Sequence, residues 1–318
     1  FNPTSLCLRV HGHDHLPHQL SVVGHPQTHG WQVATGLPAL HTDAHGFGRY
    51  LATDYDELAD SPFELGAFWS GQFEVRGISH RFVVSGAPPC FDGARLLADT
   101  QKICAAQIRL WHPDGTPPPQ RSYVFLLHAT HNGYGGLEHH NSTALICARS
   151  DLPRQGTSTQ PEGYTTLLGL ISHEYFHTWN VKRLRPAEFT RYDYQQENYT
   201  RLLWFFEGFT SYYDDLLLRR AGLLDDAGYL KLLTKTANQV LQAPGPQVPS
   251  VAPASFDAWL RYYRPDENTP NSTVSYYTKG ALVALCFDLT LRHETEHTLD
   301  DAMRALWRRC RGGPMTEG

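Results

Sequence analysis

The feature that most constrains this chain is the segment His173-Glu174-Tyr175-Phe176-His177, a His-Glu-x-x-His pattern inside an apolar run. The largely apolar stretch Leu167–Ile171 precedes it and Trp179 follows it, which predicts a buried or amphipathic helix. On a helix, residues four apart share one face, so both imidazoles can reach a single metal ion. Glu174 would then act on a water molecule at that metal. The alternative is a buried helix whose two histidines have other partners.

A carboxylate further along the chain is a candidate third ligand. Glu207 lies within the apolar and aromatic run Leu202–Tyr213. Burying a lone carboxylate is costly unless it is paired or bound to a metal. Two histidines and a glutamate form a recognised catalytic set for Zn2+, with one position left for water. The alternative is a surface position on an otherwise buried helix, but the two segments together favour a metal ligand.

These segments resemble the gluzincin zinc metallopeptidases, and more closely the M61 glycyl aminopeptidase family. The resemblance rests on two blocks, His173–Pro186 and Phe206–Phe209. Between His177 and Glu207 lie 29 residues, more than is usual in the related leucyl and alanyl aminopeptidases. The stretch Asp54–Glu64 is also similar to an M61 segment that links the amino-terminal part to the rest.

The resemblance implies a substrate anchor at Gly135-Gly136-Leu137-Glu138-His139. This stretch is similar to the exopeptidase motif of gluzincin aminopeptidases, whose glutamate holds the free α-amino group of the substrate. Glu138 would take that role, since a carboxylate suits an ammonium group, while Gly135 and Gly136 would allow close approach. Composition alone favours a glycine turn before a strand.

The resemblance also implies an oxyanion donor within Ser275–Leu282, which is similar to the Tyr-x-Lys-Gly stretch of gluzincins. Tyr277 would donate its phenol hydroxyl to the developing negative charge. Tyr276 would take the role if the register shifts by one. Without the resemblance, two tyrosines that open a helix favour a packing role.

The pattern of elements predicts an α+β chain of two domains. A β-rich amino-terminal domain is expected over residues 1–86 and is expected to be incomplete, with strands at Ser5–Val10, Phe73–Arg76 and His80–Val84. The resemblance implies a thermolysin-like catalytic domain over residues 87–318, with a small sheet beside a helical lobe. The expected elements there are a helix at 96–110, strands at 122–127 and 143–148, a proline-rich loop at 243–253, and helices at 164–180, 198–221, 226–241, 277–293 and 299–309.

Composition argues against nucleic acid and membrane as partners of this chain. The net charge of −5 offers no basic field for nucleic acid, and no run of about 20 apolar residues predicts a membrane span. The six cysteines include no Cys-x-x-Cys pair and do not suggest a disulfide framework, which favours a reducing, cytoplasmic location. The chain begins at Phe1 without a methionine, so it is expected to be an internal fragment and a periplasmic location stays open. Members of the resembled family commonly carry a further carboxy-terminal PDZ-like domain, which is expected to have been removed or to lie beyond this fragment.

The resemblance therefore implies a zinc aminopeptidase that removes small amino-terminal residues, glycine or alanine, from peptides with a free amino terminus. His173, His177 and Glu207 would bind the zinc ion, and Glu174 would act as the general base. Two alternatives stay open: a zinc endopeptidase with the same site, and a metal-stabilised scaffold that binds peptides without cleaving them. The sequence does not predict the oligomeric state.

Overall fold

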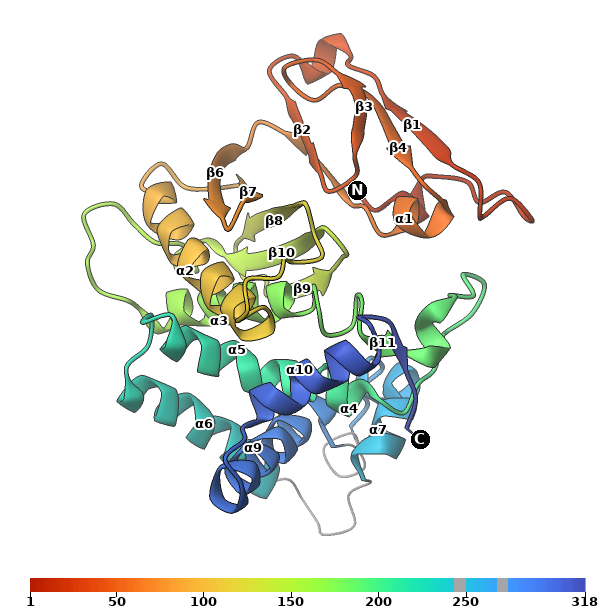
Figure 1. Ribbon diagram of the computed structural model, residues 1–318. Coiled ribbons are helices and arrows are strands. Elements are labelled where there is room, and N and C mark those ends of the chain that lie inside the picture. The colour runs from red at the N-terminus through yellow and green to blue at the C-terminus, as the bar shows by residue number, and fades with distance from the viewer. Residues whose placement is uncertain (243–249, 268–273, 318) are drawn as a thin grey trace. The chain divides into compact units, whose positions relative to one another are not determined.

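The structure is a computed structural model that describes residues 1–242, 250–267 and 274–317 (Figure 1). Packing divides the chain into two compact units. The first comprises Phe1–Ala105 and Pro117–Thr178, and the second comprises Ala106–Thr116 and Trp179–Gly318. The chain enters the second unit for the last time at Trp179, two residues after the His-Glu-x-x-His segment ends. The predicted domain boundary at residue 86 remains a prediction.

The amino-terminal part of the first unit is rich in strands, as predicted. One antiparallel sheet has the order β1-β4-β3, and β2 pairs with β5. The elements are η1 (Pro3–Ser5), β1 (His18–Val22), η2 (Pro26–Thr28), β2 (Gln32–Thr35), β3 (Ala39–Thr42), β4 (Gly48–Ala52), α1 (Tyr55–Ala59) and β5 (Phe63–Gly66).

The strand predicted at Ser5–Val10 is wrong. Ser5 ends the 3-10 turn η1, and residues 6–10 form no strand. Leu6, Leu8 and Val10 are 67%, 88% and 53% exposed, so their alternation does not mark a buried face. Without a neighbouring strand to complete the backbone hydrogen bonds, the apolar alternation alone does not form a strand.

A five-stranded mixed sheet of order β6-β7-β8-β10-β9 follows in the first unit (Figure 1). The central strand β8 runs parallel to both of its neighbours, β7 and β10. The edge strands β6 and β9 run antiparallel to β7 and β10, respectively. Tyr123–Leu127 in the central strand β8 is buried throughout, as expected of a strand covered on both faces. The predicted strands at 73–76, 80–84, 122–127 and 143–148 are confirmed by β6 (Trp69–Val75), β7 (Ile78–Ser85), β8 (Ser122–Thr130) and β10 (Ser142–Ala148).

The glycine-rich stretch after β8 is a strand, whereas composition favoured a turn. Gly135–Glu138 forms β9 and pairs with β10, with Glu138 opposite Thr143. The ladder to β10 overrides the weak strand propensity of two glycines. The edge position of β9 matters below, because its last residue is Glu138.

Two helices, α2 and α3, complete the first unit. The predicted helix at 96–110 is confirmed by α2 (Gly93–Trp111), which crosses from the first unit into the second. The metal helix, predicted at 164–180, is α3 (Glu162–Phe176) and ends four residues early. After Phe176 the helix gives way to a turn, in which the backbone N–H of Thr178 donates to the Tyr175 carbonyl at 3.1 Å. Val181, just past the predicted end, has a φ of 123°, a left-handed value that a β-branched residue rarely adopts. A 3-10 turn, η3 (Arg149–Asp151), precedes α3.

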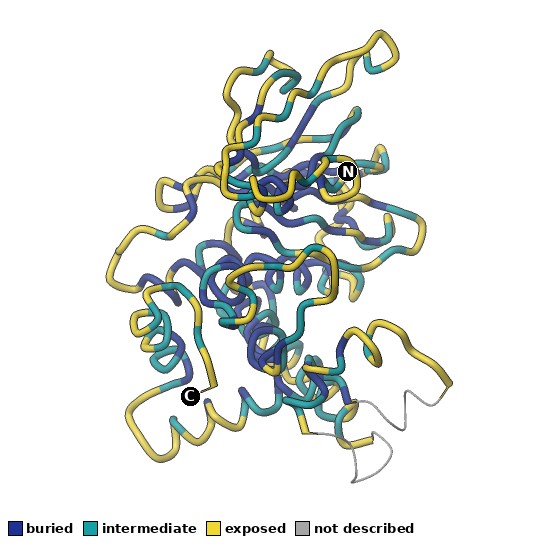
Figure 2. Tube along the Cα trace, turned by 90° about the vertical axis from the view of Figure 1, so that its right-hand side faces the viewer, coloured by how far each residue is buried: buried dark blue, intermediate teal, exposed yellow. Residues whose placement is uncertain are grey.

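Figure 2 colours the buried residues of the chain dark blue. A buried polar network joins Tyr175 of α3 to β7. His80 is 0% exposed, and its Nδ1 lies 2.9 Å from the carbonyl oxygen of Ile78. Because that carbonyl only accepts, Nδ1 carries the proton and Nε2 accepts from the Tyr175 hydroxyl at 2.9 Å. Gln120 donates to the same hydroxyl at 3.0 Å. The network fixes the tyrosine inside the His-Glu-x-x-His segment.

Acidification is expected to weaken the fold through His80. Burial lowers the pKa of His80 to about 4, below its ordinary value of 6.5. The unfolded chain therefore binds more protons between these two values, and stability falls as pH drops through that window, by about 2 kcal/mol at pH 5. Urea unfolding at pH 7.5 and pH 5 measures this loss. A His80→Gln variant should lose less stability than the wild type between the two pH values, and equal losses would contradict the assignment.

The second unit is predominantly helical, as the predicted helical lobe requires (Figure 1). The predictions at 226–241, 277–293 and 299–309 are confirmed by α6, α9 and α10. The elements are β11 (Arg185–Pro186), η4 (Ala187–Thr190), α4 (Leu203–Phe206), α5 (Gly208–Arg220), α6 (Asp226–Leu241), α7 (Val251–Phe256), η5 (Ala258–Tyr262), α9 (Tyr276–Glu294), α10 (Leu299–Arg309) and β12 (Pro314–Met315). The proline-rich loop predicted at 243–253 lies outside the described residues up to 249, and its end belongs to α7.

The helix predicted at 198–221 is shorter and interrupted. It begins only at Leu203, and the break between α4 and α5 falls at Glu207. Two aspartates hold α5 in place: Asp288 of α9 accepts from the Tyr212 hydroxyl at 2.7 Å, and Asp300 of α10 accepts from Tyr213 at 3.0 Å. The helix that follows Glu207 is therefore anchored to two neighbours.

Within residues 1–242, 250–267 and 274–317, no helix combines the length and apolar character that crossing a bilayer requires. All six cysteines lie within these ranges, and each is a free thiol.

Candidate active site

The two histidines of the predicted metal site lie on the last turn of α3. Their ring centroids are 4.7 Å apart and the ring planes are nearly perpendicular, at 81°. His177 is the C-cap of the helix and is 1% exposed, while His173 is half-buried. The helical spacing therefore brings the imidazoles together as the sequence predicted. Two neighbouring imidazoles suit zinc and several other transition metals.

Glu174 and Glu138 meet beside His177 in the first unit. One ligand atom from each of the three side chains lies within 4.8 Å of the others. Glu174 is only 5% exposed, and Glu138 is half-buried at the end of the edge strand β9. Two carboxylates this close favour a cation between them, because like charges repel in a partly buried site. The cluster therefore places two carboxylates next to an imidazole.

Gly136 makes room for the Glu174 carboxylate. A Cβ built on Gly136 would lie 2.1 Å from Glu174 Oε1, whereas one built on Gly135 would meet nothing within 4 Å. Real Cβ atoms do not approach other atoms at 2.1 Å, so the Glu174 side chain occupies the space that a larger residue would fill. The sequence predicted two glycines for the approach of substrate. That role stays a prediction, and Gly136 in addition leaves room for the Glu174 side chain.

Glu207 lies in the second unit at the junction of α4 and α5. The carbonyl of the preceding residue, Phe206, accepts from Asn180 Nδ2 at 3.2 Å and from Thr210 Oγ1 at 2.6 Å. Two side chains therefore fix the peptide group on which Glu207 is mounted. Asn180 belongs to the block that suggested the family, but the sequence gave it no role. Only its contact with Phe206, 26 residues away, reveals one.

Close packing of two glycines places Glu207 near the tyrosines of α9. A Cβ on Gly208 would lie 2.5 Å from Gly280 Cα, and a Cβ on Gly280 would lie 2.4 Å from the Trp204 carbonyl oxygen. The start of α5 and the helix α9 therefore cross with their backbones in contact, which only glycine permits. Glu207 adjoins this crossing on one helix, and Tyr277 lies one turn before it on the other.

The tyrosines at the start of α9 differ in their surroundings. Tyr276 is 0% exposed and donates to the Tyr263 hydroxyl at 3.2 Å. Tyr277 is half-buried, with its hydroxyl 3.3 Å from that of Tyr263. Burial, and then the Glu207 carboxylate, raise the pKa of Tyr277 well above its usual range. Tyr277 therefore stays a neutral phenol that can donate a hydrogen bond at any working pH.

The candidate residues thus fall into two groups. The first unit contains Glu138, Gly135, Gly136, His173, Glu174 and His177, and the second contains Glu207, Tyr276 and Tyr277. Their action as one site remains a prediction.

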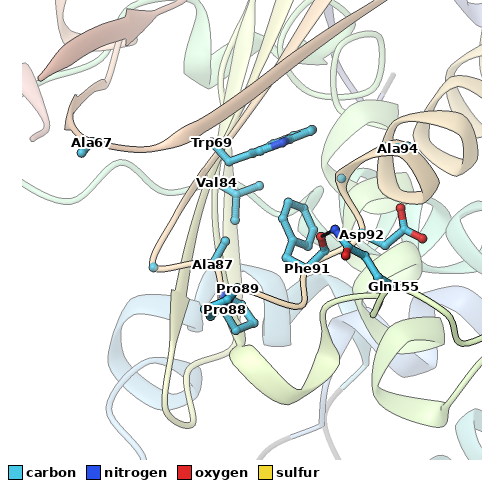
Figure 3. Close-up of a pocket in the computed structure, with 12 residues that line it drawn as sticks. Ala67, Trp69, Val84, Ala87, Pro88, Pro89, Phe91, Asp92, Ala94 and Gln155 are labelled. Atoms are coloured by element: carbon cyan, nitrogen blue, oxygen red, sulfur yellow. Dashed lines mark hydrogen bonds between the residues drawn. The ribbon is translucent and has the colours of Figure 1, made fainter. Parts of the chain in front are cut away.

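A separate pocket of about 600 Å³ lies in the first unit, at the start of α2 (Figure 3). Its walls include Trp69, Phe91 and Gln155, and no predicted site residue lines it. The Asp92 carboxylate already accepts from the Arg95 backbone N–H at 3.0 Å and so caps the helix. This pocket therefore does not contribute to the candidate site.

Comparison with known proteins identifies the family. The model of the M61 glycyl aminopeptidase matches residues 166–283, which include both histidines and Glu207. The model of the peptidase M61 N-terminal domain matches residues 1–67. The chain belongs to the M61 glycyl aminopeptidase family. Residues 68–165 of this M61 chain, which include Glu138, fall outside both matches.

Solved structures agree with this family. The chain is 44% identical to an aminopeptidase N family protein from Idiomarina loihiensis, with a TM-score of 0.92 over 97% of this chain and 52% of that chain. It thus spans about half the length of that relative. An M1 zinc metallopeptidase from Deinococcus radiodurans shares the fold, at 14% identity and a TM-score of 0.56 over 95% of this chain and 57% of that chain. A search of curated protein sequences found no match. The predicted fold class, a β-rich amino-terminal part followed by a gluzincin-like catalytic part, is confirmed.

Proposed function

We propose that this M61 chain is the catalytic part of a zinc-dependent aminopeptidase that removes glycine or alanine from the amino termini of peptides. The observation that carries the proposal is the cluster of Glu138, Glu174 and His177 in the first unit. It combines a carboxylate for an ammonium group, a second carboxylate for proton transfer and a metal-binding imidazole. Membership of a peptidase family supports hydrolysis, and the glycyl in the family name supports a small first residue.

His173, His177 and Glu207 would hold the metal ion. The paired imidazoles of α3 fit a metal by chemistry and spacing. Glu207 fits because its half-buried carboxylate would carry a negative charge that a cation would balance. Zinc, when bound, would polarise the scissile carbonyl and lower the pKa of water to about 7.

The remaining steps belong to the chain's own side chains. Glu138 would bind the free α-ammonium group and so set the distance from the amino terminus to the bond that is cut. Glu174 would take a proton from the attacking water and deliver it to the leaving amine. Tyr277 would donate its phenol hydrogen to the developing oxyanion. Tyr276 is the weaker candidate, because its hydroxyl already donates to Tyr263.

Hydrolysis of matched substrates tests this proposal. The zinc-loaded protein should cleave alanyl and glycyl anilides that have a free amine. The N-acetylated forms should react at least about 100-fold more slowly, because they cannot form the charge-assisted bond to Glu138. A chelator should abolish the reaction, and added zinc should restore it.

Three results would change the assignment. Equal cleavage of free and acetylated substrates would indicate an endopeptidase and remove the role of Glu138. Peptide binding without cleavage of either substrate would indicate a scaffold. Activity that survives full removal of metal would exclude the proposed mechanism.

A further inference from the structure

A carboxylate of the amino-terminal part holds the turn that follows Glu138. Asp60 Oδ1 lies 3.0 Å from His139 Nδ1, and Asp60 Oδ2 lies 2.7 Å from His140 Nδ1. The backbone N–H of His140 also donates to Asp60 Oδ2, at 2.8 Å. An ionised carboxylate only accepts, so both imidazoles present a proton at Nδ1. One side chain therefore fixes two consecutive residues from 79 and 80 positions away.

Asp60 is itself firmly mounted. It follows α1, and its backbone N–H donates to the Asp56 carbonyl at 2.9 Å. The other end of α1 is capped by Asp54, whose Oδ1 accepts from the Glu57 N–H at 2.8 Å. Such caps stabilise a short helix that would be marginal alone. The segment Asp54–Glu64, similar to an M61 linking segment, thus places one carboxylate on a rigid support.

The clamped turn carries the candidate substrate anchor. Glu138 is the last residue of β9, and His139 is the next residue in the chain. His139 is only 4% exposed, and its backbone N–H donates to the Ser142 carbonyl at 2.9 Å. The ladder to β10 fixes one side of Glu138, and Asp60 fixes the other. Without Asp60, the end of a four-residue edge strand would be free to fray.

We propose that Asp60 is a positioning residue that holds Glu138 where the substrate's amino terminus binds, which rests on the proposed function. The amino-terminal part of the chain then takes part in exopeptidase selection through one carboxylate. Asp60 does not touch the reacting atoms. Its effect is on where the Glu138 carboxylate lies.

Kinetics and hydrogen exchange together test this role. The variants are Asp60→Ala, Asp60→Asn and, as a control, Asp43→Asn, since Asp43 accepts from His45 and Phe47 of its own loop. Asp60→Ala should raise KM for a free alanyl anilide at least about 10-fold, with kcat changed by less than about threefold. Amide exchange in residues 135–148 should become faster in both Asp60 variants and stay unchanged in the control. A general loss of folding would instead lower kcat and speed exchange throughout the chain, and would overturn the proposal.

A double-variant cycle isolates the link to Glu138. If Asp60 acts through Glu138, Asp60→Ala combined with Glu138→Gln should have the KM of Glu138→Gln alone. Multiplying effects on KM would overturn the proposal. If the wild type cleaves no free-amine substrate, the proposed function fails, while hydrogen exchange still decides whether Asp60 holds the turn. Unchanged exchange at residues 135–148 would overturn the inference even in an active enzyme.

Discussion

Glutamine in place of Glu174 is expected to lower kcat by about 10³-fold, which corresponds to about 4 kcal/mol of transition-state stabilisation. The amide has nearly the shape of the carboxylate but cannot take a proton from water. Glu174 is 5% exposed and lies beside Glu138 and His177. Bulk water therefore has little access to take over its role as proton acceptor. Turnover of a free alanyl anilide by the zinc-loaded Glu174→Gln variant measures the loss.

Metal content separates this effect from loss of the site. Glu174 is not among the proposed ligands, so the variant should bind zinc with the wild-type stoichiometry. His177→Ala is the matched comparison on the same helix and should lose both zinc and activity. A Glu174→Gln variant that retains wild-type turnover would remove the general-base assignment.

The sequence predicts the parts of this protein whose determinants are local. The four-residue spacing of His173 and His177 requires only a helix, and the apolar run Tyr123–Leu127 requires only a buried strand. The starts of α6 and α10 follow from their N-capping residues, Asp225 and Thr298. Each of these features is determined by residues a few positions apart.

The features that the sequence does not predict depend on distant partners. Val181, which follows the predicted end of the metal helix, has a positive φ, and no residue preference signals such a value. The break at Glu207 is held by Asn180, and the turn after Glu138 by Asp60. Pairing with β10 converts the glycines of β9 from an expected turn into a strand. Such contacts join residues tens of positions apart, and only the folded chain brings them together.

Alanine in place of Gly136 is expected to lower kcat by about 100-fold, because a displacement of the base of about 1 Å suffices for such a loss. The added Cβ would lie 2.1 Å from Glu174 Oε1 and 2.4 Å from Glu174 Cδ. Either the Glu174 carboxylate moves, which misplaces the general base, or β9 shifts away from α3, which displaces Glu138 relative to that base. Overpacking of this kind also costs about 1–3 kcal/mol of stability, which urea unfolding would detect.

Gly135→Ala is the matched comparison one residue earlier on the same strand. Its Cβ would meet nothing within 4 Å, and neither glycine has a positive φ, so backbone strain is the same in both variants. Because the Glu174 carboxylate would stay in place, Gly135→Ala should keep kcat within about threefold of the wild type, whatever happens to KM. Equal losses of kcat in the two variants would show that β9 tolerates no side chain at all. A full kcat in Gly136→Ala would show that the Glu174 carboxylate can act from another position, and that this glycine does not set the place of the base.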